Sequence, residues 1–168
     1  MMRSTWFAVP ALLMLCGCDM LDPAAAYRQA AQQLRVSLDR VEPNLELAFP
    51  LERSRLRLRL TLGVENPSDM RLRVRSIGGR IFLDEGGASR SISALDFARG
   101  LDLPPRARTP VVAELSIAYG DLKESYRSLR AVVLDGRSGT WRLEGQILLD
   151  VMGIPVSVPL RSSKSVGR

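Results

Sequence analysis

The sequence has no histidine and only two cysteines among its 168 residues. Without histidine it can form no Ser-His-Asp triad, no Cys-His pair and no imidazole metal ligand. Two thiols are too few for a four-cysteine zinc or iron–sulfur site. These absences exclude the commonest hydrolase and metalloenzyme designs. They favour a non-catalytic binding, structural or interaction protein without a cofactor.

The chain is basic, with 24 Lys and Arg against 18 Asp and Glu and a net charge of +6. Nearly all of the positive charge is arginine, because Lys123 and Lys164 are the only lysines. A chain of this length holds one domain, and a domain of that size buries roughly 70% of the surface that its unfolded chain exposes. The domain therefore needs no disulfide to form a core.

The N-terminus has the pattern of a targeting segment. Arg3 precedes an apolar stretch from Trp6 to Leu15, which is too short to span a bilayer. The stretch ends in Leu15-Cys16-Gly17-Cys18, which resembles the lipobox of bacterial lipoproteins. That resemblance implies a signal peptide over residues 1–17, cleavage after Gly17 and diacylglyceryl transfer to Cys18. An ordinary secretory signal is the alternative.

Lipidation would place the protein in the cell envelope, facing the periplasm, with the membrane as its partner through Cys18. Asp19 resembles an inner-membrane retention signal, and the outer membrane is the alternative. Loss of Arg3 lowers the net charge to +5, and acylation of Cys18 leaves no thiol for a disulfide. We expect residues 18–38 to be the anchor and a tether. The segment Ala24 to Leu34 could form a short helix, but a tether is favoured because so short a helix is marginal alone.

Apolar residues at every second position predict strands in a domain over residues 39–161. The clearest run ends at Asn66-Pro67, where proline cannot donate to a ladder. That run consists of Leu56, Leu58, Leu60, Leu62 and Val64. Weaker runs predict strands over 44–49, 71–84, 91–97, 111–119, 141–149 and 154–160.

Three of the weaker strands carry further expectations. The alternation in 44–49 places Leu45, Leu47 and Phe49 on one face. Glycines 78 and 79 are expected to bend the strand over 71–84. Pro155 and Pro159 are tolerable only on a sheet edge.

One segment has helical spacing instead. Leu122, Tyr126, Leu129 and Val133 predict a helix before the penultimate strand, and the polar residues 162–168 predict a frayed tail. About seven strands with turns between them predict an all-β fold, a fibronectin-III or immunoglobulin-like β-sandwich with that one short helix.

The order of elements over about residues 40–160 resembles the late embryogenesis abundant group 2 family, the water stress and hypersensitive response domain. The segments that carry the resemblance are Val64-Glu65-Asn66-Pro67, Leu72-Arg73-Val74, Ile77 with Ile81-Phe82-Leu83, the strand from Val111 to Ile117, and Leu143-Glu144-Gly145-Gln146-Ile147. Many members have a second asparagine where this chain has Ser68. The resemblance implies a fibronectin-III-like sandwich without catalytic residues, associated with desiccation and stress protection or with binding near a membrane.

Two rows of arginines are the candidate binding residues. Arg53, Arg55, Arg57 and Arg59 alternate along one predicted strand, and Arg71, Arg73 and Arg75 along the next. Guanidinium groups suit the phosphates of lipid headgroups or of lipopolysaccharide, and an envelope protein is the alternative partner. Consecutive strands of an immunoglobulin-like sandwich lie in different sheets, however, so the rows face apart, and solvated strand faces are the favoured interpretation. No aromatic residue is interleaved with them, which argues against nucleic acid.

The remaining chemical groups predict no active site. The pairs Asp84 with Glu85 and Asp121 with Glu124 stand at turns and at a helix start. Trp141 and Phe82 are expected in the core. We therefore expect a membrane-anchored, stress- or desiccation-related protective or binding module. The alternative is an envelope component that binds a lipid or another apolar ligand between its sheets or under its helix.

Overall fold

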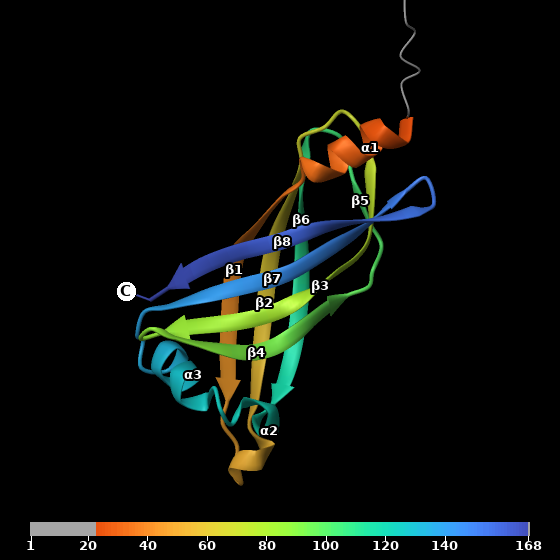
Figure 1. Cartoon of the computed structure of the whole chain (residues 1–168). Coiled ribbons are helices and arrows are strands. Elements are labelled where there is room, and N and C mark those ends of the chain that lie inside the picture. The colour runs from red at the N-terminus through yellow and green to blue at the C-terminus, as the bar shows by residue number, and fades with distance from the viewer. Residues whose placement is uncertain (1–22, 168) are drawn as a thin grey trace, which may run out of the picture.

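The computed structural model describes residues 23–167, and most of these residues lie in strands of two antiparallel sheets (Figure 1). The first sheet has the order β1-β2-β6, formed by Arg35–Glu46, Arg55–Asn66 and Ala107–Ala118. The second has the order β4-β3-β7-β8, formed by Ala88–Phe97, Leu72–Glu85, Gly139–Val151 and Ile154–Val166. A short strand β5, Leu101–Leu103, also pairs with β3.

This architecture confirms the predicted all-β sandwich, with eight strands in place of about seven. The helical elements are α1 (Pro23–Gln32), the 3-10 turn η1 (Leu51–Arg53), α2 (Tyr119–Leu122) and α3 (Tyr126–Val133). None of the helices in residues 23–167 is long and apolar enough to cross a membrane.

Strand β2 is the centre of the three-stranded sheet, and its alternation is the one that the sequence shows most clearly. It pairs with β1 on one side and β6 on the other. Every one of its five alternating apolar side chains is at most 1% exposed. A Leu or Val buried in this way stabilises the fold by about 2 kcal/mol. The prediction of a strand with one buried face is confirmed.

Strand β1 corrects the prediction for residues 44–49. It starts at Arg35 and ends at Glu46, so the chain has already left the sheet where the alternation continues. Leu47 and Phe49 are exposed, and Phe49 is 95% exposed. The backbone N–H of Ala48 instead donates to the buried hydroxyl of Ser54, 3.0 Å away, which begins the connection to β2.

The segment expected to be a tether is the helix α1. Ala30 and Ala31 on one side of it are buried, and the helix packs against β7 and β8. This tertiary packing stabilises a ten-residue helix that would be marginal alone. Cys18, Asp19 and the predicted signal peptide lie outside the described residues.

The predicted frayed tail is also corrected, because β8 continues to Val166. Thr140 and Trp141 of β7 pair with Ser165 and Lys164. The hydroxyl of Ser162 accepts a 2.7 Å hydrogen bond from the N–H of Leu38 in β1, so this part of β8 joins the two sheets. Strand β8 is the edge of its sheet, as its prolines predicted.

The strand predicted over 71–84 is present as β3, and its irregularities lie beside the two glycines rather than at them. Strand β3 is continuous from Leu72 to Glu85, and its register shifts lie on either side of the glycines, between Val74 and Ser76 against β7 and between Ile81 and Phe82 against β4.

The predicted helix before the penultimate strand is present, but it is divided into α2 and α3 at Ser125. That serine is buried, and its hydroxyl donates to the carbonyl oxygen of Ser91 at 3.0 Å. Trp141 is fully buried, as predicted. Phe82 is not in the core: its ring is partly exposed on the outer face, with the guanidinium of Arg142 5.0 Å from its centre.

Asn66 does more than end β2. Its side chain is fully buried, and its amide nitrogen donates to the carbonyl oxygens of Met70, Leu103 and Pro104 at 2.8–3.2 Å. Its oxygen accepts from the Ser68 hydroxyl at 2.7 Å. One amide thus satisfies the backbone of two separate connections.

We predict that Asn66→Ala lowers the free energy of unfolding by about 3 kcal/mol, because buried carbonyl groups lose their donor. Asn66→Asp should destabilise the fold at least as much at neutral pH, since a carboxylate cannot donate to those carbonyls. Urea unfolding of the two variants tests this. A loss below about 1 kcal/mol for both would show that the Asn-Pro pair is only a strand terminator.

A second polar cluster joins all three strands of the first sheet. Asp39 lies at a bulge of β1, and Arg108 of β6 forms an ion pair with it. Between them lies Gly63 of β2, where a Cβ atom would be 2.4 Å from the Arg108 guanidinium. The Ser37 hydroxyl, 2.7 Å from the Asp39 carboxylate, and the Arg108 guanidinium hold the pKa of Asp39 below its ordinary value of 3.8, although partial burial opposes them.

A lowered pKa in the folded state adds stability above the unfolded value, and that stability is lost as the pH falls through the folded value. We therefore expect Asp39→Asn to be less stable than wild type at pH 7, with the difference closing as the pH falls below the ordinary pKa of 3.8 and through the lowered pKa of the folded state. Ser37→Ala should show a smaller change of the same sign. Thermal unfolding between pH 2 and 7 measures both, and equal stabilities at pH 7 would contradict the role of the cluster.

Candidate functional site

The two arginine rows lie in different sheets, as expected. Arg55, Arg57 and Arg59 project outward from β2, whereas Arg73 and Arg75 project outward from β3 of the other sheet, with Arg71 just before it. Arg53 belongs to η1 and does not continue the first row. The two rows therefore do not form one basic surface.

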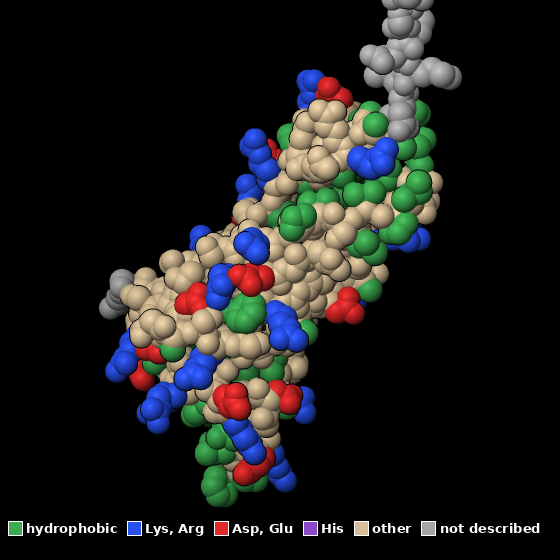
Figure 2. All heavy atoms as spheres, viewed as in Figure 1, with side chains coloured by type: hydrophobic (Ala, Val, Ile, Leu, Met, Phe, Trp, Pro, Cys, Tyr) green, Lys and Arg blue, Asp and Glu red, His purple; other side chains and the backbone are tan. Residues whose placement is uncertain are grey.

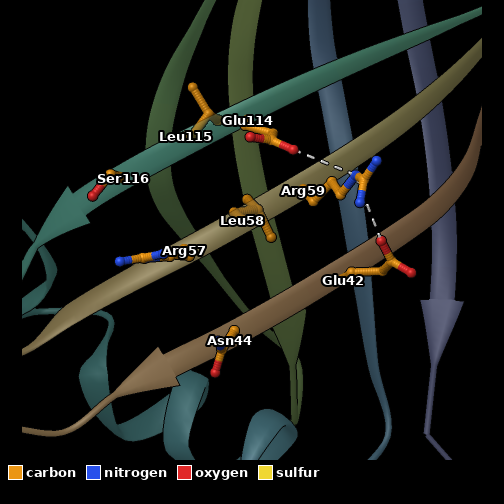
Figure 3. A pocket seen from close by; sticks show the side chains of 8 residues that line it. All are labelled: Glu42, Asn44, Arg57, Leu58, Arg59, Glu114, Leu115 and Ser116. Atoms are coloured by element: carbon orange, nitrogen blue, oxygen red, sulfur yellow. Dashed lines mark ion pairs between the residues drawn. The ribbon is translucent and has the colours of Figure 1, made fainter.

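Acidic side chains neutralise most of the β2 row. In the register, Arg59 stands directly between Glu42 of β1 and Glu114 of β6. Its guanidinium is 4.0 Å from the Glu42 carboxylate and 3.5 Å from that of Glu114 (Figure 3). Arg57 pairs with Glu46 at 2.9 Å. Exposed pairs of this kind contribute little stability, but they cancel charge that would otherwise attract anions.

These residues surround a hollow of about 560 Å³ on the outer face of the first sheet (Figure 3). The residues lining it are Glu42, Asn44, Arg57, Leu58, Arg59, Glu114, Leu115 and Ser116. Its volume suits a small molecule. Its charged groups already have partners, however: Arg59 pairs with Glu42 and Glu114 within the hollow, and Arg57 pairs with Glu46 beside it. Ligand sites are instead mostly apolar with a few directed polar groups. The lining of the hollow carries both positive and negative groups, so it favours neither an anion nor an apolar molecule.

A second hollow, of about 410 Å³, lies where the two sheets open toward each other between β4 and β6. Residues 95–99 and 112–115 line it. The opposite side of the sandwich is closed, because β1 and β8 lie side by side there. Leu95 and Ala113 beside this opening are buried. The apolar face between the sheets is therefore covered by the protein's own side chains.

The β3 row differs in its partners. Arg75 pairs with Asp150 of β7 at 3.5 Å. Within residues 23–167, Arg71 and Arg73 form no ion pair, and both are exposed. Because β3 begins beside the end of β7, these two arginines lie near the β7–β8 connection. The sequence pattern identified both rows but could not show which one keeps its charge free.

The described residues offer no metal site: no group of three or more Asp, Glu or Cys side chains converges within residues 23–167. Of the acidic residues named from the sequence, Asp84 and Glu85 pair with arginines. Asp84 receives two bonds from Arg142, at 3.1 and 3.3 Å, and Glu85 pairs with Arg137 at 3.8 Å.

Comparison with known proteins extends only to the fold. No protein-family model and no curated protein matches the sequence. The solution structure of AT1g01470 from Arabidopsis thaliana is similar, with a TM-score of 0.53 and 14% identity over 80% of this chain and 84% of that one. A putative late embryogenesis abundant protein, At2g46140.1, has a TM-score of 0.49 and 12% identity over 88% of this chain and 80% of that one. A protein from Archaeoglobus fulgidus has a TM-score of 0.47 and 12% identity over 78% and 97%.

At these identities the likeness is one of fold. The likeness to AT1g01470, the one of these with a TM-score above 0.5, supports the β-sandwich fold that the strand order suggested. The catalytic, lipid-binding and membrane properties of this chain have to be argued from its own residues.

The neutralisation of the β2 row is testable by removing its acidic partners. We predict that Arg57→Gln/Glu46→Gln, which removes one complete ion pair, leaves the attraction to anionic vesicles unchanged, whereas Glu42→Gln/Glu114→Gln strengthens it about fivefold or more at low salt, because the freed Arg59 guanidinium can contribute about 1 kcal/mol. Vesicle co-sedimentation of a chain carrying Cys18→Ala, which removes the acyl anchor, measures this. A loss of binding in the Arg57→Gln/Glu46→Gln variant would show instead that the row binds headgroups.

Proposed function

We propose that this protein is a lipid-anchored component of the cell envelope, held to the membrane through Cys18. Its sandwich faces the periplasm and acts as a non-catalytic protective or binding module under water stress. The observation that carries the proposal is the Leu15-Cys16-Gly17-Cys18 motif, which closes an apolar segment. Helix α1 as described begins at Pro23, five residues after the proposed acylated Cys18.

The stress-related part of the proposal rests on the order of the strands. The sheet orders β1-β2-β6 and β4-β3-β7-β8 and the helices before β7 match what the group 2 resemblance implies. The Asn66-Pro67 motif within that resemblance is a buried junction of the fold. These features therefore account for the fold, and the protective role is proposed from the resemblance.

Binding of an apolar ligand is the weaker candidate. Its motivation is the helix from Leu122 to Val133, which would have to cover a cavity that holds the ligand. In the structure Leu122, Leu129 and Val132 are buried in the hydrophobic core, which α3 enters beside β3 and β1. Because the helix packs on protein, this arrangement supports the protective or binding module over the apolar-ligand carrier.

Asp19 directly follows the proposed acylated residue. By its resemblance to a retention signal we assign the protein to the inner membrane, with the outer membrane as the alternative. Density-gradient separation of the two membranes distinguishes these locations.

We predict that Cys18→Ala moves the protein from the membrane fraction to the soluble fraction of the envelope. Acyl chains contribute about 0.8 kcal/mol per buried methylene, so their loss removes the anchor. Cys16→Ala is the matched control, because this thiol lies in the proposed signal peptide and should not affect anchoring. Mass spectrometry of the mature N-terminus detects the acyl groups directly.

The same strains test the role. After drying or osmotic shock, cells with Cys18→Ala or without the gene should survive less well than wild type, and cells with Cys16→Ala should survive equally well. Equal survival of the deletion strain would contradict the stress function while leaving the anchor intact. An unmodified Cys18 would contradict the anchor.

A further inference from the structure

The two ends of the sandwich differ in what they carry. At one end lie α1, where the described chain begins, and the β7–β8 connection (Figure 1). Helix α1 packs against both of these strands. At the other end lie η1 and α2, which contact each other. Hydrophobic side chains are exposed at both ends (Figure 2), over the β7–β8 hairpin at the first and over the β1–β2 connection at the second.

The length of chain before α1 decides which end can face the membrane. Pro23 is five residues after Cys18. An extended chain advances at most about 3.6 Å per residue, so these five residues reach at most about 18 Å. Strand β2 has 12 residues and is therefore about 40 Å long. An acyl group on Cys18 thus keeps the α1 end near the bilayer, while the far end can project about 40 Å beyond it.

The β7–β8 hairpin at this end is built against the usual preferences of its turn. Met152 and Gly153 both have positive φ, 53° and 84°, as in a two-residue turn that favours Asn-Gly. A methionine at such a φ costs stability relative to asparagine or glycine. Met152 is nevertheless 64% exposed, and Ile154 beside it is 58% exposed. Folding therefore does not explain why an apolar residue occupies this position.

Charge at the same end favours a bilayer surface. Arg71 and Arg73 are exposed and lack an ion-pair partner among the described residues. The strand register places Arg73 between Asp150 of β7, close to the hairpin, and Asp102 of β5. Asp150 itself pairs with Arg75, and neither aspartate forms an ion pair with Arg73. Exposed apolar residues next to free arginines match an interface in which acyl chains lie beneath anionic phosphates.

We propose that this end is a membrane-docking surface, with Met152 and Ile154 entering the headgroup boundary and Arg71 and Arg73 contacting lipid phosphates. The proposal rests on the proposed anchor at Cys18 and adds an orientation to it. The anchored sandwich then stands on the bilayer, and the exposed loop with Leu47, Phe49 and Leu51 points into the periplasm.

The test uses the full acylated protein in vesicles of phosphatidylethanolamine and phosphatidylglycerol. After signal removal and acylation, an introduced cysteine is the only free thiol. A fluorophore is attached to Ile154→Cys or, as the matched control, to Phe49→Cys, and nitroxide-labelled lipids quench it. We expect quenching at residue 154 to exceed that at residue 49 roughly threefold or more, because only the former lies at the acyl boundary.

Two further variants and one control separate docking from folding. Met152→Asn suits the turn, so its melting temperature should stay unchanged or rise, while quenching at residue 154 falls. Arg71→Gln/Arg73→Gln should also lower this quenching, whereas Arg55→Gln/Arg57→Gln on the other sheet should leave it unchanged.

Equal quenching at residues 154 and 49, or stronger quenching at 49, would overturn the orientation even though the protein is acylated. Unchanged quenching in Met152→Asn would likewise overturn the role of the hairpin. If mass spectrometry finds Cys18 unmodified, the anchor itself fails, so the two failures are told apart.

Discussion

The fold depends on the burial of one strand face, that of β2. Its five alternating Leu and Val side chains lie between the two sheets, while both of its backbone edges are paired. Because β2 is the central strand of its sheet, its register also sets the positions of β1 and β6. The Asp39–Arg108 ion pair and the Glu42–Arg59–Glu114 arrangement both span this strand. Burial of this strand face therefore determines which charged side chains of neighbouring strands lie opposite one another.

The pairing of charged side chains, rather than the net charge, determines which surfaces of this protein can attract anions. A net charge of +6 suggests a polyanion binder. The structure instead sets Arg57 and Arg59 against glutamates of neighbouring strands. Each such pair is weak in energy, yet together they neutralise two of the three arginines that project from β2. Free arginines remain where β3 begins, next to the exposed apolar hairpin.

The proposed anchor, docking surface and protective role form a hierarchy. The anchor depends only on the residues around Cys18. The docking surface depends on the anchor and on the short reach to α1. The protective role is inferred separately, from the resemblance of the strand order, but the expected survival defect of Cys18→Ala makes its action depend on the anchor and not on the orientation of the sandwich.

Much of the fold was predictable from the sequence. The alternation in β2, the edge position of the prolines in β8 and the helix before β7 follow from side-chain period and proline chemistry, which are local. The arginine rows were visible for the same reason.

Residues distant in sequence decided the rest. Helix α1 forms because β7 and β8 bury Ala30 and Ala31, and residues 162–166 are a strand because β7 and Leu38 pair with them. Leu47 and Phe49 are exposed because the chain leaves the sheet at Glu46, although their spacing is that of a buried face. Composition and the spacing of apolar residues thus determined which segments can be strands. Which arginines stay unpaired and which apolar side chains stay exposed was decided only by the tertiary structure. The reason is that the partner of a side chain is set by packing against residues distant in the sequence.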